Sequence, residues 1–492
     1  MTRAAGLASA LCLLCLDFLA PLRAESPTEA YIRKQIKAGQ AANLLGLSEA
    51  ERTLRPGFLE NLLGAASGIP RSGIQIVGGI VVEPLDLQSL DATHDVALNQ
   101  FRFAGPVDIS YAHFHGGLSL EGSTFESTLT GYRVTVDQDV FAESTRFDGG
   151  CVLNFAAVQG TLSFMNAEFR GKPSFNSVHV GGMGAFAGAV FSGDADFISA
   201  SFAADFDGTG ARFESENGDV TFNSMRVGHV AFFDNAHFSG NADFAHMEIG
   251  RNFEARKAEF TNAGRTADFQ HMRIGTKFLM HDVSFAGLVM LQDLTANELE
   301  FFDVRWPPRE KFECEDLTYR RINTTRAGKD DLLDWPELSR YSPSIYVGLA
   351  AYLDDHARRG DASQVRLNRQ WREGERLNPF RWLLNRLYWA VVGYGERIWW
   401  AFLWIAAIVA IGFFTFRRKD GMQLVDKARP DLTYNPFWYS LGLFLPIGDL
   451  GQAKCWKPRD DRKWPKHYAQ IHVLLGWLFV PVALAAITGL LK

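Results

Sequence analysis

The sequence has little cysteine: there are five among 492 residues, and two of them, Cys12 and Cys15, lie in an apolar stretch at the N-terminus. The other three, Cys151, Cys314 and Cys455, are scattered, which argues against a disulfide framework and against a zinc site of paired cysteines. An excess of basic residues is also missing, because the formal net charge is −6. This excludes a dominantly basic nucleic-acid binder, and we expect no nucleic-acid partner.

Motifs typical of catalytic and cofactor sites are missing as well. No Gly-x-Gly-x-x-Gly follows a predicted strand, no haem-attachment motif is present, and no Cys-x-x-Cys occurs outside the N-terminal apolar stretch. The sequence therefore predicts no catalytic residue, no cofactor and no metal site. An enzyme is the weakest of the functional interpretations.

Tyrosine is scarce beside phenylalanine, with 12 Tyr against 39 Phe, and glycine is abundant at 45 residues. Such a skew suggests one repeated environment that accepts an aromatic ring without a hydroxyl group. The length of 492 residues is typical of about three structural units.

Residues 1–24 have the features of a secretory signal peptide. Arg3 supplies the positive charge, an apolar stretch runs from Leu7 to Leu16, and the small Ala24 precedes the polar Glu25. An uncleaved membrane anchor is the alternative interpretation of this segment.

Two apolar segments near the C-terminus, 398–416 and 471–491, are long enough to cross a membrane. The loop between them, 417–467, contains eleven Lys and Arg residues, so the positive-inside rule places it in the cytoplasm. Residues 25–397 are then exported, in agreement with the signal peptide. The sequence predicts a multi-pass protein of the bacterial inner membrane, in contact with the lipid bilayer, with its repeat domain in the periplasm.

The middle of the chain is an internal repeat with a period of 22 or 25 residues. An apolar residue opens each unit, and a phenylalanine stands eleven residues after each one. The opening positions are Val158, Val180, Phe202, Val227, Ile249 and Ile274. The phenylalanines are Phe169, Phe191, Phe213, Phe238, Phe260 and Phe285. A fixed period with insertions at one place predicts a solenoid.

The spacing within each unit identifies the kind of solenoid. Apolar residues recur every five or six positions, whereas a helical repeat would show spacings of three and four. Gly, Asn, Asp and Ser, which favour turns, lie between them. Each unit is therefore predicted to be one coil of four very short strands, stacked about 4.8 Å from the next coil.

This pattern resembles the pentapeptide-repeat family, whose five-residue unit is a small residue, a polar residue, Leu or Phe, and two variable residues. Residues 166–170 (Asn-Ala-Glu-Phe-Arg) and 241–245 (Asn-Ala-Asp-Phe-Ala) fit it closely. The resemblance implies a mainly β fold, a right-handed quadrilateral β-helix over 73–304. We expect a helical N-terminal cap at 25–72, a helical hairpin and connector at 305–378 that turns at Gly360, and an α-helical membrane domain at 379–492.

The C-terminal third is also similar to a bacterial group of membrane proteins in which pentapeptide-like coils precede two spans. The similarity rests on short motifs such as Gly393-Tyr394-Gly395, Tyr439-Ser440-Leu441 and Asp449-Leu450-Gly451. Members of the group are often described loosely as membrane-associated oxidoreductases. That activity is not carried over, because no cofactor motif in this sequence supports it.

The apolar segment 435–451, between the two spans, is too short to cross the membrane comfortably. It is predicted to be interfacial or re-entrant, and Pro446, Gly448 and Asp449 are its candidate functional residues. A pore loop between two spans is the arrangement of simple cation channels, but the run of filter carbonyls that such a channel needs has no counterpart here. A packing role is the favoured interpretation, and a channel is the alternative.

Two further groups of side chains could be interpreted as sites. His246 and His271 occupy equivalent positions in consecutive coils, so they are expected to stack about 5 Å apart as a solvated ladder rather than a metal site. The carboxylate pairs Asp205 with Asp207 and Glu214 with Glu216 are expected to be solvated rather than to form a glycosidase site.

The sequence as a whole favours a non-enzymatic scaffold. Its periplasmic β-helix would present a long surface to an unknown protein or envelope partner, or to another copy of the chain in a homo-oligomer. The alternative is a channel- or transport-related protein with a pore-like segment at 435–451. The acidity of residues 151–300, with 18 Asp and Glu against 10 Lys and Arg, is mild for a DNA mimic.

Overall fold

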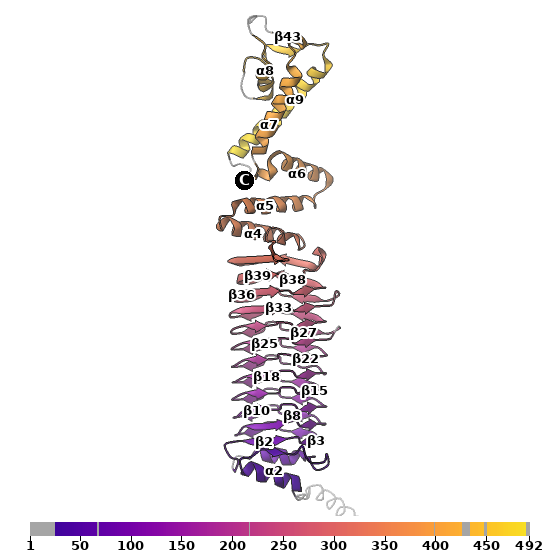
Figure 1. The fold of residues 1–492 in the computed structure, drawn as a ribbon, viewed down its shortest axis with the longest axis vertical. Helices are drawn as coiled ribbons and strands as arrows, with labels where there is room; N and C mark the ends of the chain where they lie inside the picture. The colour runs from indigo at the N-terminus through magenta and orange to yellow at the C-terminus, as the bar shows by residue number, and fades with distance from the viewer. Residues whose placement is uncertain are drawn as a thin grey trace, which may run out of the picture. The chain divides into compact units, whose positions relative to one another are not determined.

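A computed structural model describes residues 25–65, 68–215, 217–397, 399–425, 433–446 and 450–488 (Figure 1). The predicted signal peptide and the end of the predicted second span lie outside the described residues. The chain divides into two compact units, Met1–Gly348 and Leu349–Lys492, and each is described by itself.

The first unit is a parallel β-solenoid of about 11 turns, which confirms the mainly β fold expected from the repeat (Figure 1). Each turn contributes up to four short strands, and each strand pairs in parallel with its equivalent in the next turn. Phe147, for example, pairs with Phe169, which pairs with Phe191. The four resulting faces are called walls 1 to 4, in chain order from β5.

The strands of walls 1 and 2 belong to one sheet. Wall 1 comprises β5 (Asp91–Ala92), β9 (His113–Phe114), β13 (Thr135–Val136), β17 (Ala157–Val158), β20 (His179–Val180), β24 (Ser201–Phe202), β28 (Arg226–Val227), β32 (Glu248–Ile249) and the first residues of β36 (Arg273–His281) and β39 (Thr295–Phe302). Wall 2 comprises β2 (Ile74–Val77), β6 (Val96–Asn99), β10 (Leu118–Ser119), β14 (Val140–Phe141), β18 (Leu162–Ser163), β21 (Gly184–Ala185), β25 (Phe206–Asp207), β29 (Ala231–Phe232), β33 (Asn252–Arg256), the last residues of β36 and β39, and β41 (Arg321–Arg326).

Walls 3 and 4 complete the coils. Wall 3 comprises β3 (Ile80–Val81), β7 (Arg102–Phe103), β11 (Thr124–Phe125), β15 (Arg146–Phe147), β19 (Glu168–Phe169), β22 (Val190–Phe191), β26 (Arg212–Phe213), β30 (His237–Phe238), β34 (Glu259–Phe260) and β37 (Ser284–Phe285). Wall 4 comprises β4 (Leu85–Asp86), β8 (Val107–Asp108), β12 (Leu129–Thr130), β16 (Cys151–Val152), β23 (Ala195–Asp196), β27 (Asp219–Thr221), β31 (Asn241–Asp243), β35 (Thr266–Asp268), β38 (Leu288–Gln292) and β40 (Phe312–Glu315).

The corners of the coil depend on left-handed residues that recur about every eleven positions. They precede walls 1 and 3, and many are not glycine: Ser144 has a φ of 53°, Asn166 of 56° and Ser177 of 55°. Asn, Ser, Asp and His tolerate this conformation better than β-branched residues do. The residue after each of these three corners is fully buried: it is Ala167 after Asn166, Thr145 after Ser144 and Val178 after Ser177. Ala189 and Ala211, which are equivalent to Ala167 in the next two coils, are fully buried as well.

Stacked phenylalanine rings fill the solenoid axis. On wall 3, the ring centroids of Phe169 and Phe191 lie 4.8 Å apart and those of Phe191 and Phe213 lie 4.7 Å apart, with nearly parallel planes. Each of these rings is 5% exposed or less. Because offset-stacked rings attract one another beyond their burial, the ladder reinforces the register of the coils. The excess of phenylalanine over tyrosine is explained by this apolar axis.

Both ends of the solenoid are covered. The N-terminal end carries α2 (Pro27–Lys37), β1 (Ala42–Asn43) and α3 (Pro56–Leu63). Parallel pairing continues past residue 304 through β40 and β41, and Trp335, which is 2% exposed, stacks on Phe301 at the C-terminal end. The chain there contains η1 (Arg309–Lys311), β42 (Lys329–Asp330), η2 (Trp335–Glu337) and α4 (Pro343–Asp355).

The second unit is helical. It contains α5 (Arg359–Gly374), α6 (Pro379–Val392), η3 (Gly393–Gly395), α7 (Trp399–Phe416), η4 (Lys419–Gly421), β43 (Met422–Leu424), α8 (Pro436–Phe444), β44 (Trp456–Pro458) and α9 (Lys463–Ile487). Gly360 lies inside the first turn of α5, so the expected turn at this glycine is wrong. The chain turns instead at 356–358, where Ala357 has a φ of 59°.

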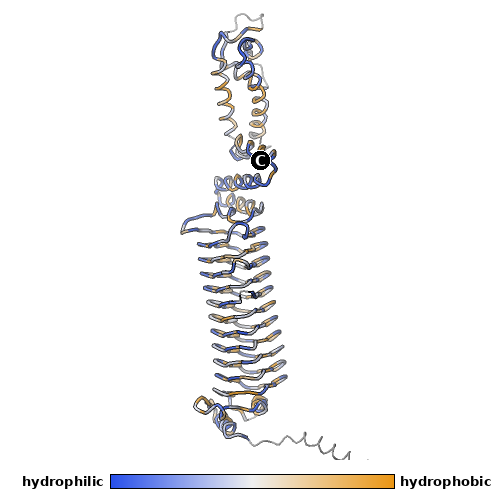
Figure 2. Tube along the Cα trace, turned by 90° about the vertical axis from the view of Figure 1, so that its right-hand side faces the viewer, coloured by the Kyte–Doolittle hydropathy of each residue, from blue (hydrophilic) through white to orange (hydrophobic). Residues whose placement is uncertain are grey.

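Two helices of this unit are long and apolar enough to span a membrane, α7 and the 463–485 part of α9, and Figure 2 shows apolar residues along both. Only 28% of each apolar window is buried, whereas the core helix of a soluble protein would be mostly buried. Large apolar side chains are therefore exposed on both helices, among them Leu403, Phe414, Leu474 and Leu478.

Candidate functional site

A groove of about 720 Å³ runs along the edge of wall 1 across five consecutive coils. Its floor is made of the residues that directly follow each wall 1 strand, and all five of them are small. They are Gly181, Ala203, Gly228, Gly250 and Gly275. The outward-facing residue two positions earlier in each coil forms the border of the groove.

The glycines of the floor are required by the close approach of adjacent coils. A Cβ atom added at Gly250 would lie 2.0 Å from the carbonyl oxygen of Gly228, and one at Gly228 would lie 2.0 Å from that of Ala203. Real Cβ atoms do not come this close to a backbone oxygen, so any side chain there would push the coils apart. Neither glycine has a positive φ, and the requirement is therefore one of space.

The border of the groove is polar and carries both signs of charge. Arg226 donates to Glu248 at 3.2 Å, and Arg273 lies 4.0 Å from the other oxygen of Glu248. Ser201 and the ring of His179 form a hydrogen bond of 2.5 Å. The side chains of Arg226, Glu248 and Arg273 are 64%, 49% and 78% exposed, so their ion pairs add little to the stability of the fold. These side chains remain able to contact a ligand.

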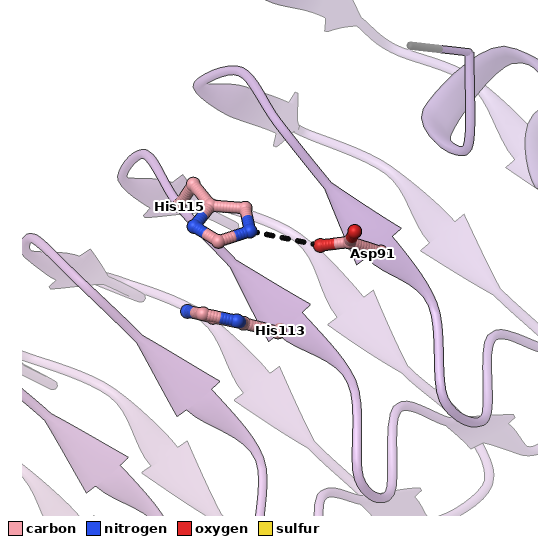
Figure 3. A group of neighbouring side chains, drawn as sticks. All are labelled: Asp91, His113 and His115. Carbon is pink, nitrogen blue, oxygen red and sulfur yellow. Dashed lines mark hydrogen bonds and ion pairs between the residues drawn. The ribbon is translucent and has the colours of Figure 1, made fainter.

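The same edge of wall 1 looks different toward the N-terminus. The positions that are glycine or alanine in the groove are occupied there by Thr93, His115, Asp137 and Gln159. His113 and His115 point to the same outer face of the wall, because the residue between them, Phe114, is buried. Asp91 pairs in register with His113 on the preceding strand (Figure 3).

These side chains form an Asp–His cluster, defined here as Asp91, His113, His115 and Asp137. His115 contacts Asp91 through Nε2 at 2.9 Å and Asp137 through Nδ1 at 3.1 Å. His113 contacts the other oxygen of Asp137 through Nε2 at 3.0 Å. The ligand atoms of Asp91, His113 and His115 all lie within 4.8 Å of one another, which is close enough to share a metal ion (Figure 3).

The cluster is accessible from solvent. The side chains of His113, His115 and Asp137 are 39%, 41% and 39% exposed, and that of Asp91 is 71% exposed. Hydrogen bonds from His113 and His115 lower the pKa of Asp137, with the bond from His113 contributing most. Because all four side chains are at least 39% exposed, an ion can reach the cluster without any movement of the fold.

The histidine ladder expected from the sequence is present. The rings of His246 and His271 stack with centroids 4.7 Å apart, both are exposed, and His271 Nδ1 lies 3.3 Å from Asp293. Asp205 and Asp207 accept backbone hydrogen bonds from Val230 and Thr209, both at 2.9 Å. These two carboxylates therefore support turns.

The acidic pair at the insertion between walls 3 and 4 is only partly described. Glu214 is paired with Arg212 at 2.6 Å, and Glu216 lies outside the described residues.

At the predicted functional segment, the second unit holds one short helix, α8, against which the chain returns from residue 450. The helix α8 begins after Asn435, whose side chain caps it, and extends about 14 Å, which is too short to cross a membrane. Gln452 joins the returning chain to the residues that precede α8: it donates to the carbonyl of Thr433 at 3.1 Å and accepts from the backbone N–H of Asn435 at 3.4 Å. The returning chain packs on α8, since Gly442 lies close to Leu450.

The helix α8 packs against both long helices, α7 and α9. The Ser440 hydroxyl donates to the carbonyl of Val409 at 2.9 Å, near the middle of α7. His472 of α9 is fully buried and contacts the carbonyl of Ser440 at 3.0 Å and the hydroxyl of Tyr468 at 3.2 Å. A Cβ atom at Gly476 would lie 1.8 Å from the carbonyl oxygen of Phe444, so this glycine is needed for the contact.

Of the predicted functional residues in this segment, the structure describes only Pro446, which lies two residues after the end of α8 and is half-buried. Gly448 and Asp449 lie outside the described residues. Neither the groove nor the Asp–His cluster was found from the sequence. A signal for the cluster exists, because Asp91 and His113, and likewise His115 and Asp137, are separated by one 22-residue coil.

Comparison of the chain with protein-family models, with curated proteins and with solved structures finds no match. The arguments for function therefore rest on the sequence and the geometry of this chain.

Proposed function

We propose that this chain is a membrane-anchored scaffold of the pentapeptide-repeat family, whose solenoid lies on the periplasmic side of a bacterial inner membrane and binds an extended polymer segment along wall 1. The observation that carries the proposal is the groove. A floor of glycine and alanine runs through five stacked coils, and a linear chain can follow it for about 20 Å at one coil per 4.8 Å.

The shape of the groove favours an extended partner over a globular one. Apolar atoms of the wall 1 strands line it, while polar groups recur along its border once per coil. Such a series of equivalent polar positions matches a ligand that itself repeats, such as an extended polypeptide or a glycan strand of the envelope.

Anchoring in a membrane is supported by the exposed apolar surface of α7 and α9. In water, this surface would be an unusually large hydrophobic patch for a monomer, whereas lipid would satisfy it. The basic loop 417–467 favours a cytoplasmic location for the connection between the two helices.

Export of the solenoid can be tested by a sandwich fusion. Alkaline phosphatase inserted at residue 330, two residues after the surface turn at Gly328, is expected to be active because the enzyme folds only after export. A matched insertion in the basic loop at residue 428 should be inactive. An inactive fusion at residue 330 would overturn the periplasmic assignment.

Use of the groove can be tested by photo-crosslinking in the full-length chain. A photoreactive residue in place of Arg226, on the groove border, is expected to form adducts in cells that are lost when Ala203→Trp fills the floor. Ala203 is exposed, so the larger ring projects outward. The control reporter replaces Ile198, which lies in the turn between walls 4 and 1, is also exposed and does not line the groove. Adducts that persist in the Ala203→Trp chain would contradict the proposal.

A channel remains the second candidate, because α8 ends beside the middle of α7 and α9. A short helix that ends at this depth directs its partial negative charge toward the membrane interior, where it would favour a cation. Purified protein reconstituted in planar bilayers tests this candidate. A current that Asp449→Ala abolishes would support the channel and contradict the scaffold as the main function.

A further inference from the structure

We propose that the Asp–His cluster of wall 1 binds one divalent transition-metal ion of the zinc type through Asp91, His113 and His115. This inference does not depend on the groove or on the membrane anchor. It rests on three potential ligands whose donor atoms already converge within 4.8 Å.

The ligand set suits such an ion. Imidazole nitrogen and carboxylate oxygen are the usual protein ligands of Zn²⁺ and of its neighbours in the first transition row, whereas Mg²⁺ and Ca²⁺ favour sites made of oxygen alone. Three protein ligands leave at least one position for water or for another ligand, and the exposure of the cluster keeps that position accessible.

Asp137 orients both histidines. Its two oxygens accept from Nε2 of His113 at 3.0 Å and from Nδ1 of His115 at 3.1 Å. A carboxylate that accepts the second ring N–H of a metal-binding histidine fixes the tautomer in which the other nitrogen is free to bind the ion. Nδ1 of His113 and Nε2 of His115 are then the ligand atoms, and Asp137 is a positioning residue.

The ligand atoms, which lie within 4.8 Å of one another, must come to about 3.3 Å to bind one tetrahedral ion. Nε2 of His115 lies 2.9 Å from an oxygen of Asp91. Two ligands at about 2.0 Å from a tetrahedral ion are about 3.3 Å apart. The exposed side chains of Asp91, His113 and His115 can make this adjustment by rotation, while the parallel pairing of the strands keeps their backbones in register.

The ladder of His246 and His271 is the natural comparison. Its rings also stack, at 4.7 Å, but within the described residues it does not belong to a group of three converging ligands. The two histidine pairs share the fold and the exposure, and they differ in the carboxylates that surround them. The ladder is therefore a matched control for the cluster.

The test is titration of the full chain, purified in detergent with a tag that contains no histidine, with Zn²⁺ by calorimetry and with Co²⁺ by visible absorption. We expect one ion per chain with histidine ligation. His113→Gln with His115→Gln should abolish this binding, and Asp91→Asn, which keeps the shape of an exposed side chain, should weaken it at least tenfold. Asp137→Asn should weaken it about 10- to 100-fold and alter the Co²⁺ spectrum.

The control chain with His246→Gln and His271→Gln should bind as the unchanged protein does. The proposal is overturned if the unchanged chain binds neither ion, or if the His113→Gln, His115→Gln chain binds with the same stoichiometry and affinity. A rise in the apparent Tm of the unchanged chain with Zn²⁺, lost in Asp91→Asn, would support it independently.

Discussion

The two halves of wall 1 share the same parallel strand pairing and differ in their outward-facing residues, most clearly in the column that follows each strand. In the N-terminal coils this column carries Thr93, His115, Asp137 and Gln159, and the surface is filled with charged groups that contact one another. In the later coils the column is glycine or alanine, and the surface opens into a groove. A solenoid can therefore change its surface chemistry without any change in its core, because the residues that stack inside and those that face outward alternate along each strand.

The difference should be most evident when the same column position is changed to alanine in each half. Gly250→Ala places a Cβ atom 2.0 Å from the carbonyl oxygen of Gly228, and we expect it to lower the free energy of unfolding by about 1–3 kcal/mol. Gln159→Ala, at the equivalent column position, should change it by less than about 0.5 kcal/mol. Denaturant unfolding of both variants measures the two effects, and equal effects would mean that the coils of the groove are not unusually close.

Acid should destabilise the N-terminal cap, residues 27–63, before it destabilises the coils of the groove, residues 181–275. Glu29, beneath the N-terminal coils, is 1% exposed and accepts from Arg55 Nε at 2.9 Å. Burial by itself would raise the pKa of Glu29, but the hydrogen bonds from Arg55 and from the backbone of Ser26 outweigh it, and the pKa is lowered. A lowered pKa in the folded state means that this stabilisation is present above about pH 4.5 and is lost as the pH falls through the folded value.

Hydrogen exchange measured by mass spectrometry at pH 7 and at pH 3.5 tests this. After correction for intrinsic rates, segment 27–63 should lose protection in acid before segment 181–275 does. Glu29→Gln should cost about 1–2 kcal/mol near pH 7 and remove most of the pH dependence of segment 27–63. Loss of protection in both segments at the same pH would contradict the role assigned to Glu29.

The smallest effect on the free energy of unfolding is expected for a substitution at the border of the groove. Glu248→Gln removes the partner of Arg226 and Arg273, but these side chains are 49–78% exposed, and such pairs contribute about 0–1 kcal/mol. The unfolding midpoint should therefore remain nearly unchanged. Adduct formation from the reporter at position 226 should change instead, which would distinguish a binding role of the border from a structural one.

The coil and its phase could be predicted from the sequence because they depend on which residues are apolar. Phe169 and Phe191 occupy the same column as expected, and Ala167 lies at a corner. The two long helices were also located, although α9 begins at Lys463, eight residues before the predicted span, since hydropathy does not register the polar first turns of a helix.

The surface could not be predicted in the same way. Whether Gly250 lines a groove depends on the distance between two coils, and whether His115 meets Asp91 depends on side-chain rotamers. Neither is encoded in a periodic pattern. The exact left-handed positions were missed for a related reason. Turn-favouring residues occupy many of them, but so do Arg133, Phe155 and Lys257, so composition alone does not locate each corner.

The insertions between walls 3 and 4 have a practical consequence. The extra residues before β27 and β35 leave the parallel pairing of both strands with their neighbours intact, and the next left-handed corner follows at Ser224 and His271 as it does elsewhere. The turn between walls 3 and 4 can therefore accept an inserted peptide without disturbing the strands on either side. A short epitope or a fluorophore placed in this turn would protrude sideways from a chosen coil. Labels in the turns of two different coils would be separated by a known number of coil spacings of about 4.8 Å.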